Sequence, residues 1–238
     1  MGQKINPMSN RLPLTKAWRS RWISTRDYRD RLLEDLRIRA FLQERYGRQS
    51  ALARIELKRT VGGQVHVILH ASKPGIIIGR AGAGIMELRG KLETLLGIKP
   101  HKSKGADQAP RSRGGKQEGN NLKIDIVEVR QPELSAVLVA ENIASQIERR
   151  IAYRRAVRQS MERVMQAGAK GVKMVVSGRL GGAEISRREK FTDGSVPLST
   201  FRADIDYAHV EARTAYGTIG IKVWIHRGKL VEEQEPQE

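Results

Sequence analysis

The chain has 238 residues, and its 44 lysines and arginines against 26 aspartates and glutamates give a formal net charge of +18. The absence of cysteine excludes disulfides, thiolate nucleophiles and cysteine-ligated metal sites, and no apolar run approaches the roughly 20 residues of a membrane-spanning helix. So large a basic excess repels itself unless an acidic partner neutralises it. We therefore expect a soluble cytoplasmic protein that binds an extended polyanion.

The first part of the chain is predicted to form a basic arm and a helix. Residues 1–23 are basic and irregular, which is typical of an arm. Ser24 and Asp27 resemble a capping box, and apolar side chains then recur near helical spacing, which predicts a helix over about 25–46. The recurring apolar positions of this helix are Tyr28, Leu32, Leu36 and Ala40, with Leu33 and Phe41 beside them.

A β-hairpin is predicted next. Residues 53–60 and 64–71 read as strands, and the Gly62-Gly63 pair between them is a strong turn signal. Because successive side chains of a strand point to opposite faces, one face of the second strand would consist of Val65, Val67 and Leu69.

Two helices and a further strand are predicted beyond the hairpin. Pro74 suits the first turn of a short helix, and helical spacing then resumes and ends at Gly97. Residues 99–121 combine four glycines and six lysines and arginines with almost no apolar side chains, so we expect a flexible basic loop there. A strand over 122–129 follows it.

The second half of the chain has helices first and strands afterwards, which is typical of an α+β layer arrangement. Apolar spacing predicts two amphipathic helices between Leu134 and Met165, and Gly168 closes the second. Strand-like segments follow at 172–177, 185–191, 200–207 and 218–226. The last ten residues, 229–238, form an acidic tail.

The most informative local pattern is Gly79-Arg80-Ala81-Gly82, which lies between the two helices of the first half. Glycines lack Cβ, so the main chain can come close to a sugar-phosphate backbone, and the following helix offers free N–H groups and a positive dipole end. Arg80 adds a charge, and the apolar residues 76–78 could wall a groove for bases. The stretch lacks the Gly-Lys-Ser/Thr of a triphosphate loop and the spacing of a dinucleotide fingerprint. A tight turn between two helices is the alternative from this stretch alone.

The predicted order of elements around this loop, helix–strand–strand–helix–helix–strand, resembles a KH domain of type II, whose Gly-x-x-Gly loop clamps single-stranded nucleic acid. Further motifs cover both halves of the chain. They are Met1-Gly2-Gln3-Lys4-Ile5-Asn6-Pro7, the run 74–85, Glu128-Val129-Arg130-Gln131-Pro132-Glu133-Leu134, and the runs 176–184, 202–207 and 216–225. Together these motifs resemble the bacterial-type S3 family of small-subunit ribosomal proteins.

The resemblance implies an α+β fold in two domains. A type II KH domain would span 24–131, with a three-stranded mixed sheet, helices on one face and an insertion at 99–121. A C-terminal domain would span 132–228, with two helices packed on a four-stranded, mainly antiparallel sheet. The resemblance also implies a structural constituent of the small ribosomal subunit and not an enzyme. The implied partners are 16S-type ribosomal RNA in the subunit head, messenger RNA, and the neighbouring proteins S10 and S14.

In the family, basic residues of the helices after the KH domain face the channel through which messenger RNA enters, and they assist its unwinding. The matching residues here are Arg149, Arg150, Arg154, Arg155 and Arg158. The spacing supports this reading independently, because positions 154 and 155 each lie about one helical turn from position 158. Guanidinium groups this close repel one another unless phosphate lies between them. A solvated helix face is the alternative.

Other basic residues are candidates for contact with ribosomal RNA: Lys4, Arg11, Lys16, Arg179, Arg187 and Arg188. Gly178-Arg179-Leu180-Gly181 repeats the Gly-x-x-Gly pattern but follows a strand, so we predict a turn there. The chain departs from the family at Ser9 and Pro13, which replace glycines, and at Gln159, which replaces a commonly basic residue. The 99–121 insertion is a further departure, and we expect it to reach RNA or solvent near the KH domain.

Two other functions stay open at this point. A free regulatory protein of the KH type would bind RNA outside the ribosome. A magnesium-dependent nuclease could use Asp204, Asp206 and Glu184, although carboxylates in so basic a chain more often pair with arginine. His66 and His70 have the spacing of a zinc helix, but four residues of a strand span about 13 Å, too far for one metal ion. We expect no metal, no cofactor, no membrane contact and no small-molecule substrate.

Overall fold

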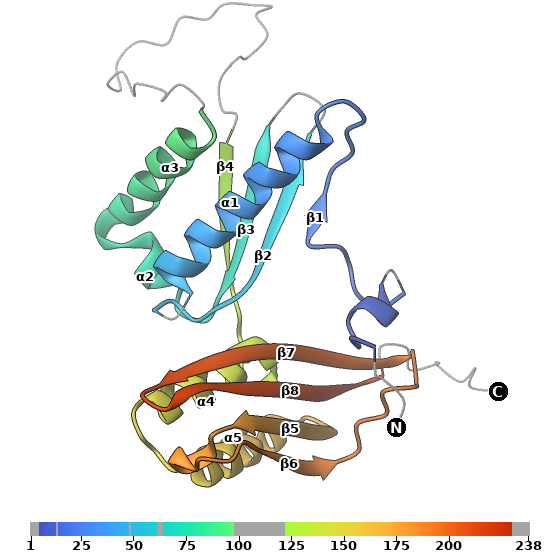
Figure 1. Cartoon of the computed structure of the whole chain (residues 1–238). Coiled ribbons are helices and arrows are strands. Elements are labelled where there is room, and N and C mark those ends of the chain that lie inside the picture. The colour runs from blue at the N-terminus through green and yellow to red at the C-terminus, as the bar shows by residue number, and fades with distance from the viewer. Residues whose placement is uncertain (1–4, 13, 48, 61–63, 98–121, 230–238) are drawn as a thin grey trace, which may run out of the picture. The chain divides into compact units, whose positions relative to one another are not determined.

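The chain folds into two compact units (Figure 1). One unit is Arg19–Val129, and the other combines Met1–Trp18 with Arg130–Glu238. The computed structural model describes residues 5–12, 14–47, 49–60, 64–97 and 122–229. The predicted Gly62-Gly63 turn, the basic stretch at 99–121 and the acidic tail beyond residue 229 therefore lie outside the described residues. Within the described ranges, no helix has both the length and the apolar character to cross a bilayer.

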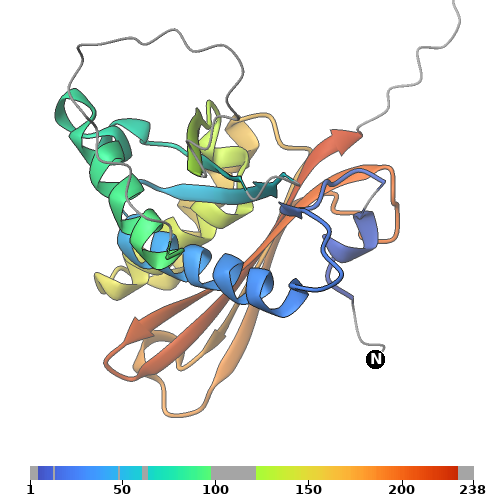
Figure 2. The same cartoon turned by 90° about the horizontal axis from the view of Figure 1, so that it is seen from above.

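The first unit is a mixed sheet with helices on one face. The sheet has the strand order β1-β2-β3-β4, in which β2 and β3 are antiparallel and the two outer pairs are parallel. Its elements are β1 (Ser20–Arg21), α1 (Tyr28–Tyr46), β2 (Leu52–Arg59), β3 (Val65–Ala71), α2 (Pro74–Ile78), α3 (Ala83–Leu95) and β4 (Leu122–Glu128). Both views show α1 and α3 on the same face of the sheet (Figures 1 and 2). The predicted order of helices and strands is thus confirmed.

The sheet has one strand more than predicted. Ser20 and Arg21 pair in parallel with Leu57 and Lys58 at the edge of the sheet. A two-residue strand is too short to show the alternation by which strands are recognised in a sequence, so the sequence pattern places these residues in the basic arm.

The core of this unit lies between the sheet and its helices. Val65, Val67 and Leu69 of β3 are buried, as the alternation predicts. They belong to one cluster with apolar side chains of the two longer helices, namely Ile38, Leu42, Leu88 and Leu92.

Helix α1 is turned differently from the prediction. The predicted apolar positions Tyr28, Leu32 and Leu36 are 56%, 39% and 54% exposed. The buried side chains of α1 are instead Asp35, Ile38, Leu42 and Tyr46. A carboxylate thus occupies the inward face of the helix, and a pattern based on apolar residues cannot show this.

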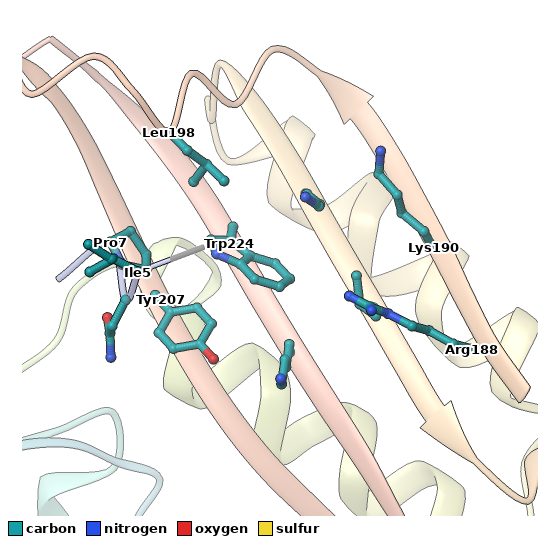
Figure 3. A pocket seen from close by; sticks show the side chains of 11 residues that line it. Ile5, Pro7, Arg188, Lys190, Leu198, Tyr207 and Trp224 are labelled. Atoms are coloured by element: carbon teal, nitrogen blue, oxygen red, sulfur yellow. The ribbon is translucent and has the colours of Figure 1, made fainter. Parts of the chain in front are cut away.

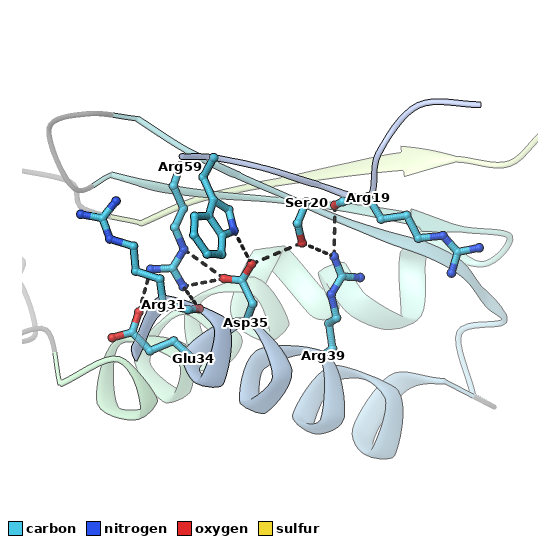
Figure 4. A network of polar contacts seen from close by, with 8 residues as sticks. Arg19, Ser20, Arg31, Glu34, Asp35, Arg39 and Arg59 are labelled. Atoms are coloured by element: carbon cyan, nitrogen blue, oxygen red, sulfur yellow. Dashed lines mark hydrogen bonds and ion pairs between the residues drawn. The ribbon is translucent and has the colours of Figure 1, made fainter. Parts of the chain in front are cut away.

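Asp35 is the centre of a polar network that joins α1 and β1 to β2 (Figure 4). Its carboxylate accepts hydrogen bonds from Arg59 Nε at 3.0 Å, from Trp22 Nε1 at 2.8 Å and from the Ser20 hydroxyl at 3.3 Å. Arg39 in turn donates to the Ser20 hydroxyl at 2.9 Å. A buried carboxylate needs such partners because it has lost its hydration. The network therefore sets the orientation of α1.

The second unit has two helices on one face of a four-stranded sheet. The strand order is β6-β5-β8-β7 and all neighbours are antiparallel. Its elements are α4 (Ala136–Glu148), α5 (Tyr153–Gln166), β5 (Gly171–Gly178), β6 (Arg187–Gly194), β7 (Ala203–Thr214) and β8 (Gly217–Lys229). This architecture confirms the prediction for the C-terminal region.

The two faces of this sheet differ in character. Val172, Met174 and Val176 of β5 are buried in the cluster that α4 and α5 cover. Because side chains alternate along a strand, Lys173 and Ser177 point to the opposite face. Among the described residues, α4 and α5 both cover the other face (Figure 1), and residues 5–7 line part of this outer face.

Candidate nucleic-acid interface

The Gly-x-x-Gly loop lies where α2 ends and α3 begins. Gly79 follows α2 with φ +69° and ψ −176°, and Gly82 precedes α3 with φ +80°. Ala81 between them also has a positive φ, +50°. Residues with a Cβ rarely adopt the conformations of the two glycines, so the path of the loop depends on both.

The glycines of this region have different surroundings. A Cβ at Gly79 would lie 2.9 Å from the Gly84 nitrogen, and a Cβ at Gly84 would lie 2.5 Å from the Ile77 carbonyl oxygen. These two glycines therefore permit the close packing of α2 against α3. A Cβ at Gly82 would meet no heavy atom of the described residues within 4 Å. Gly82 thus leaves open space in front of the main chain, where a sugar-phosphate backbone could approach.

The loop also has the charge and exposure that suit an anion. Helix α3 has no acidic residue in its first turn and no side-chain cap, so its first N–H groups can serve an external acceptor. Arg80 is exposed, and none of the described carboxylates pairs with it. Ile77 is buried and fixes the loop to the core, whereas Ile76 and Ile78 are exposed and offer apolar surface beside the loop.

The arginines predicted to contact messenger RNA lie around the turn between α4 and α5. Arg149 and Arg150 follow α4 and are exposed, and Arg155 and Arg158 are exposed on α5. In the described part of the chain, none of these four arginines has an ion-pair partner. We call these four residues the corner arginines. Guanidinium groups without carboxylates nearby form a surface that phosphate oxygens can bridge.

Arg154 differs from the corner arginines because it has a carboxylate partner. Its Nη2 donates to Glu189 Oε1 of β6 at 2.9 Å, and its guanidinium lies 5.6 Å from the centroid of the Tyr153 ring. The hydrogen bond to Glu189 raises the pKa of Arg154, and the same bond holds the pKa of Glu189 below its ordinary value. The side chain remains 61% exposed. Glu189 neutralises this cation, so the predicted mutual repulsion of three arginines is weaker than the spacing alone suggests.

Two of the predicted contacts to ribosomal RNA point into the second unit. Arg11 is fully buried and donates to the carbonyls of Ala203 and Thr200, each at 2.8 Å. This burial lowers the pKa of Arg11, although Asp204 acts in the opposite direction. Lys16 Nζ lies 2.5 Å from the Asp204 carboxylate. The prediction that Arg11 contacts RNA is wrong, because no part of its side chain is accessible. Both cations instead join the N-terminal segment to the second unit.

The other residues predicted to contact ribosomal RNA differ in how accessible their side chains are. Lys4 lies outside the described residues. Arg179 donates from Nε to the Ala183 carbonyl at 3.0 Å and lies over the Tyr216 ring, within the turn that its position after a strand predicts. Arg187 and Arg188 are exposed on β6, where a ligand can reach them.

Four of the five acidic and histidine residues considered for metal chemistry, namely Asp204, Asp206, His66 and His70, are engaged in structural contacts. Asp206 accepts hydrogen bonds from the Ala136 main-chain N–H at 3.0 Å and from Arg227 at 2.7 Å. His66 Nε2 lies 2.7 Å from the Asp125 carboxylate. Among the described residues, no three side chains of His, Asp or Glu are grouped so that they could hold a metal ion.

The structure also brings together residues that the sequence analysis did not connect. On the sheet face opposite α4 and α5, Arg188 joins Lys173, Lys222, Tyr207 and Trp224 along an open cleft of about 690 Å³ (Figure 3). The two-residue spacing of Lys222 and Trp224 indicates that both side chains lie on one face of their strand. The order of the strands in the sheet could not be read from that spacing.

Comparison with known proteins covers both units. Residues 37–134 match the KH domain family, and residues 143–225 match the family described as Ribosomal protein S3, C-terminal domain. The chain is 45% identical to the small ribosomal subunit protein uS3 of Thermodesulfovibrio yellowstonii, over 97% of this chain and 95% of that protein. It is 43% identical to uS3 of Caldicellulosiruptor saccharolyticus over 98% and 96%, and 45% identical to uS3 of Streptococcus pneumoniae over 97% and 95%.

The chain belongs to the uS3 family. It is therefore a structural, RNA-binding protein of the small ribosomal subunit, located in the ribosome in the cytoplasm, and not an enzyme. The resemblance that the sequence motifs indicated is confirmed over nearly the whole chain. Membership in the uS3 family also removes the nuclease alternative.

Proposed function

We propose that the chain binds ribosomal RNA in the head of the small subunit and lines the channel through which messenger RNA enters. The observation that carries the second part is the set of exposed corner arginines at the α4–α5 turn, which have no carboxylate partner among the described residues. The Gly-x-x-Gly loop supports the first part, with its open space at Gly82, the exposed Arg80 and the uncapped start of α3.

The corner arginines would act on messenger RNA through its phosphates. Contacts to phosphate carry no base specificity, which suits a channel that accepts every message. Ala156 and Val157 of α5 are buried, so the helix holds Arg155 and Arg158 at a fixed place on the surface. Arginines that bind a single strand more strongly than a duplex shift a base-paired message toward its open form. Assistance to unwinding is then passive and needs no energy source in this chain.

We also propose S10 and S14 as protein neighbours. The exposed apolar side chains of α1 support a protein contact on the first unit. Leu32, Leu33 and Leu36 are 39%, 40% and 54% exposed, and Ile23 shortly before the helix is 86% exposed. Apolar side chains that gather on one helix without cover are typical of a protein interface.

The test of the messenger role uses small subunits that carry Arg155→Gln together with Arg158→Gln. We expect these subunits to pass a stable hairpin at least about fivefold more slowly than wild type, because each lost charged hydrogen bond to phosphate is worth about 1.5 kcal/mol or more. An unstructured message should move at the wild-type rate. Toeprinting of ribosomes on the two messages measures both rates.

The matched control is Arg163→Gln, which removes an exposed arginine from the same helix but outside the cluster. Sedimentation checks that each variant enters small subunits. A free regulatory protein would not sediment with small subunits, so the same measurement distinguishes that role from the proposed one. Equal rates for the double variant and the control on the hairpin message would contradict the proposal.

A further inference from the structure

The outer face of the C-terminal sheet carries an aromatic and cationic cleft that the proposed function does not use (Figure 3). All four strands contribute to it, and its volume is about 690 Å³. The side chains that matter are Lys173, Arg188, Lys190, Tyr207, Lys222 and Trp224. We call this feature the sheet cleft.

The register of the strands explains why these side chains meet. Lys173 of β5 is opposite Trp224 of β8, and Trp224 is opposite Tyr207 of β7. In the adjacent row, Lys190 of β6 and Lys222 of β8 are both opposite the same β5 residue. Residues two positions apart on a strand share a face, so the two rows lie side by side on the outer surface.

The aromatic part of the sheet cleft is a pair of rings in contact. The ring centroids of Tyr207 and Trp224 are 5.2 Å apart, with 40° between their planes. Lys173 Nζ lies 4.9 Å from the centroid of the Trp224 ring. Both rings are only partly covered, although their sheet has a fully buried core on its other face. Aromatic surface left open in this way is available for stacking against a ligand.

Arg188, Lys190 and Lys222 make part of the sheet cleft cationic, while Ile5, Pro7 and Leu198 line another part of it. Arg188, Lys190 and Lys222 each find no carboxylate partner within the described ranges. Among the described residues that line the sheet cleft, there is no aspartate or glutamate. The neighbouring Glu189 of β6 is paired with Arg154 of α5, which lies on the helix side of the sheet. The charge of these side chains therefore favours an anionic ligand.

We propose that the sheet cleft binds an unpaired nucleotide of single-stranded RNA. The base contacts the rings of Trp224 and Tyr207, and the flanking phosphates contact Arg188, Lys190 and Lys222. A sheet surface with aromatic side chains is a recurrent platform for bases, because every base has a face that can stack. The volume falls in the range of sites for small organic groups, roughly 300–1,000 Å³. An acidic protein segment would satisfy the cations but leave the two rings without a stacked partner.

The first experiment measures binding of single-stranded RNA to the full chain by fluorescence anisotropy. The probes are an oligoadenylate and an oligomer of the same length and charge whose central positions lack bases. All measurements use the Gly82→Asp background, which weakens binding at the KH loop, and the contribution of the sheet cleft is the difference between this parent and Trp224→Leu. We expect the oligoadenylate to bind about tenfold more tightly than the abasic oligomer, as stacking on one ring provides.

The variant Trp224→Leu should remove this preference, and Trp224→Phe should restore most of it. The matched control is Trp18→Leu, which removes an exposed tryptophan outside the sheet cleft and should keep the preference. Circular dichroism checks that each variant is folded. If Trp224→Leu does not fold, the double variant Lys222→Gln with Arg188→Gln replaces it. This double variant should lower the affinity for both oligomers, and it should also reduce the salt dependence of their binding.

The second experiment locates the partner in the assembled small subunit. A photo-crosslinking amino acid replaces Lys190, and the adduct is identified by mass spectrometry. An RNA adduct supports the proposal, whereas a protein adduct alone or no adduct would overturn it. Equal binding of the two oligomers to the folded parent, or a preference of the same size in the parent and in Trp224→Leu, would also overturn it. None of these outcomes depends on the corner arginines, so the proposed role at the messenger channel is tested separately.

Discussion

Single residues of the KH loop region show two different uses of glycine. Gly79 and Gly84 allow α2 and α3 to pack, because a Cβ at either would collide with the main chain. Gly82 has open space where its Cβ would be and requires only its left-handed backbone. Substitutions at Gly82 therefore test ligand binding, whereas substitutions at Gly84 test packing.

Replacement of Gly82 by Asp should weaken RNA binding more than replacement by Asn. Both side chains tolerate the left-handed conformation better than most, and they have nearly the same shape. Only Asp places a negative charge where we expect phosphate, which costs about 1 kcal/mol at 4 Å in water, or roughly fivefold in affinity. Titration of the two variants with one RNA oligomer measures the difference. Equal affinities would show that no phosphate lies at this position.

Replacement of Gly84 by Ala should destabilise the first unit by about 1–3 kcal/mol, because its Cβ would lie 2.5 Å from the Ile77 carbonyl oxygen. Gly90→Ala on the same helix is the matched control, since nothing among the described residues lies within 4 Å of its Cβ. That control should gain roughly 0.5–1 kcal/mol from helix propensity. Urea denaturation gives both values. A destabilised Gly90→Ala or an unaffected Gly84→Ala would contradict this reading of the contacts.

At the scale of secondary-structure elements, α1 shows which features of a helix a sequence pattern can predict. The position of the helix and its end near Gly47 follow from the sequence, but its buried face does not. The inward stripe includes Asp35, whose burial depends on Arg59 of β2 and on the short strand β1. These partners are distant in the chain, so a local pattern could not reveal them.

The ion pair between Asp35 and Arg59 predicts a large effect of a single substitution. Their side chains are 4% and 8% exposed, and Asp35→Ala would leave the Arg59 guanidinium with Glu34, at 2.7 Å, as its remaining carboxylate partner. We expect a loss of about 2 kcal/mol or more in the free energy of unfolding, because Asp35 also accepts hydrogen bonds from Trp22 and Ser20. Asp35→Leu combined with Arg59→Met should recover much of that loss, because both charges are then removed. Glu44→Ala on the exposed side of α1 is the control for chemical denaturation.

At the candidate site, too, the sequence spacing of charged residues does not reveal partners that are distant in the chain. Helical spacing correctly grouped Arg155 and Arg158 on α5, since spacing along one helix is a local property. It could not show that Glu189 of β6 neutralises Arg154. It also could not show that the carbonyl oxygens of Pro7, Thr200 and Ala203 hold a buried Arg11, because basic composition alone does not separate structural from exposed cations.

At the scale of the whole molecule, the chain has a net charge of +18 and folds into two units, and in each unit we propose a separate surface for RNA. The first unit has the KH loop and the exposed Arg80. The second has the corner arginines and the sheet cleft. Many separate cationic surfaces suit a long folded polyanion better than one small anionic ligand, which agrees with membership in the uS3 family.

The salt dependence of RNA binding tests the central claim most directly. A plot of the logarithm of the association constant against the logarithm of salt concentration should fall with a slope of about −0.7 for each phosphate contacted. Replacement of all four corner arginines by glutamine should make the slope less steep by roughly 2.8, which corresponds to four lost contacts. A slope that is the same in wild type and the fourfold variant would contradict the claim that these arginines neutralise RNA phosphates.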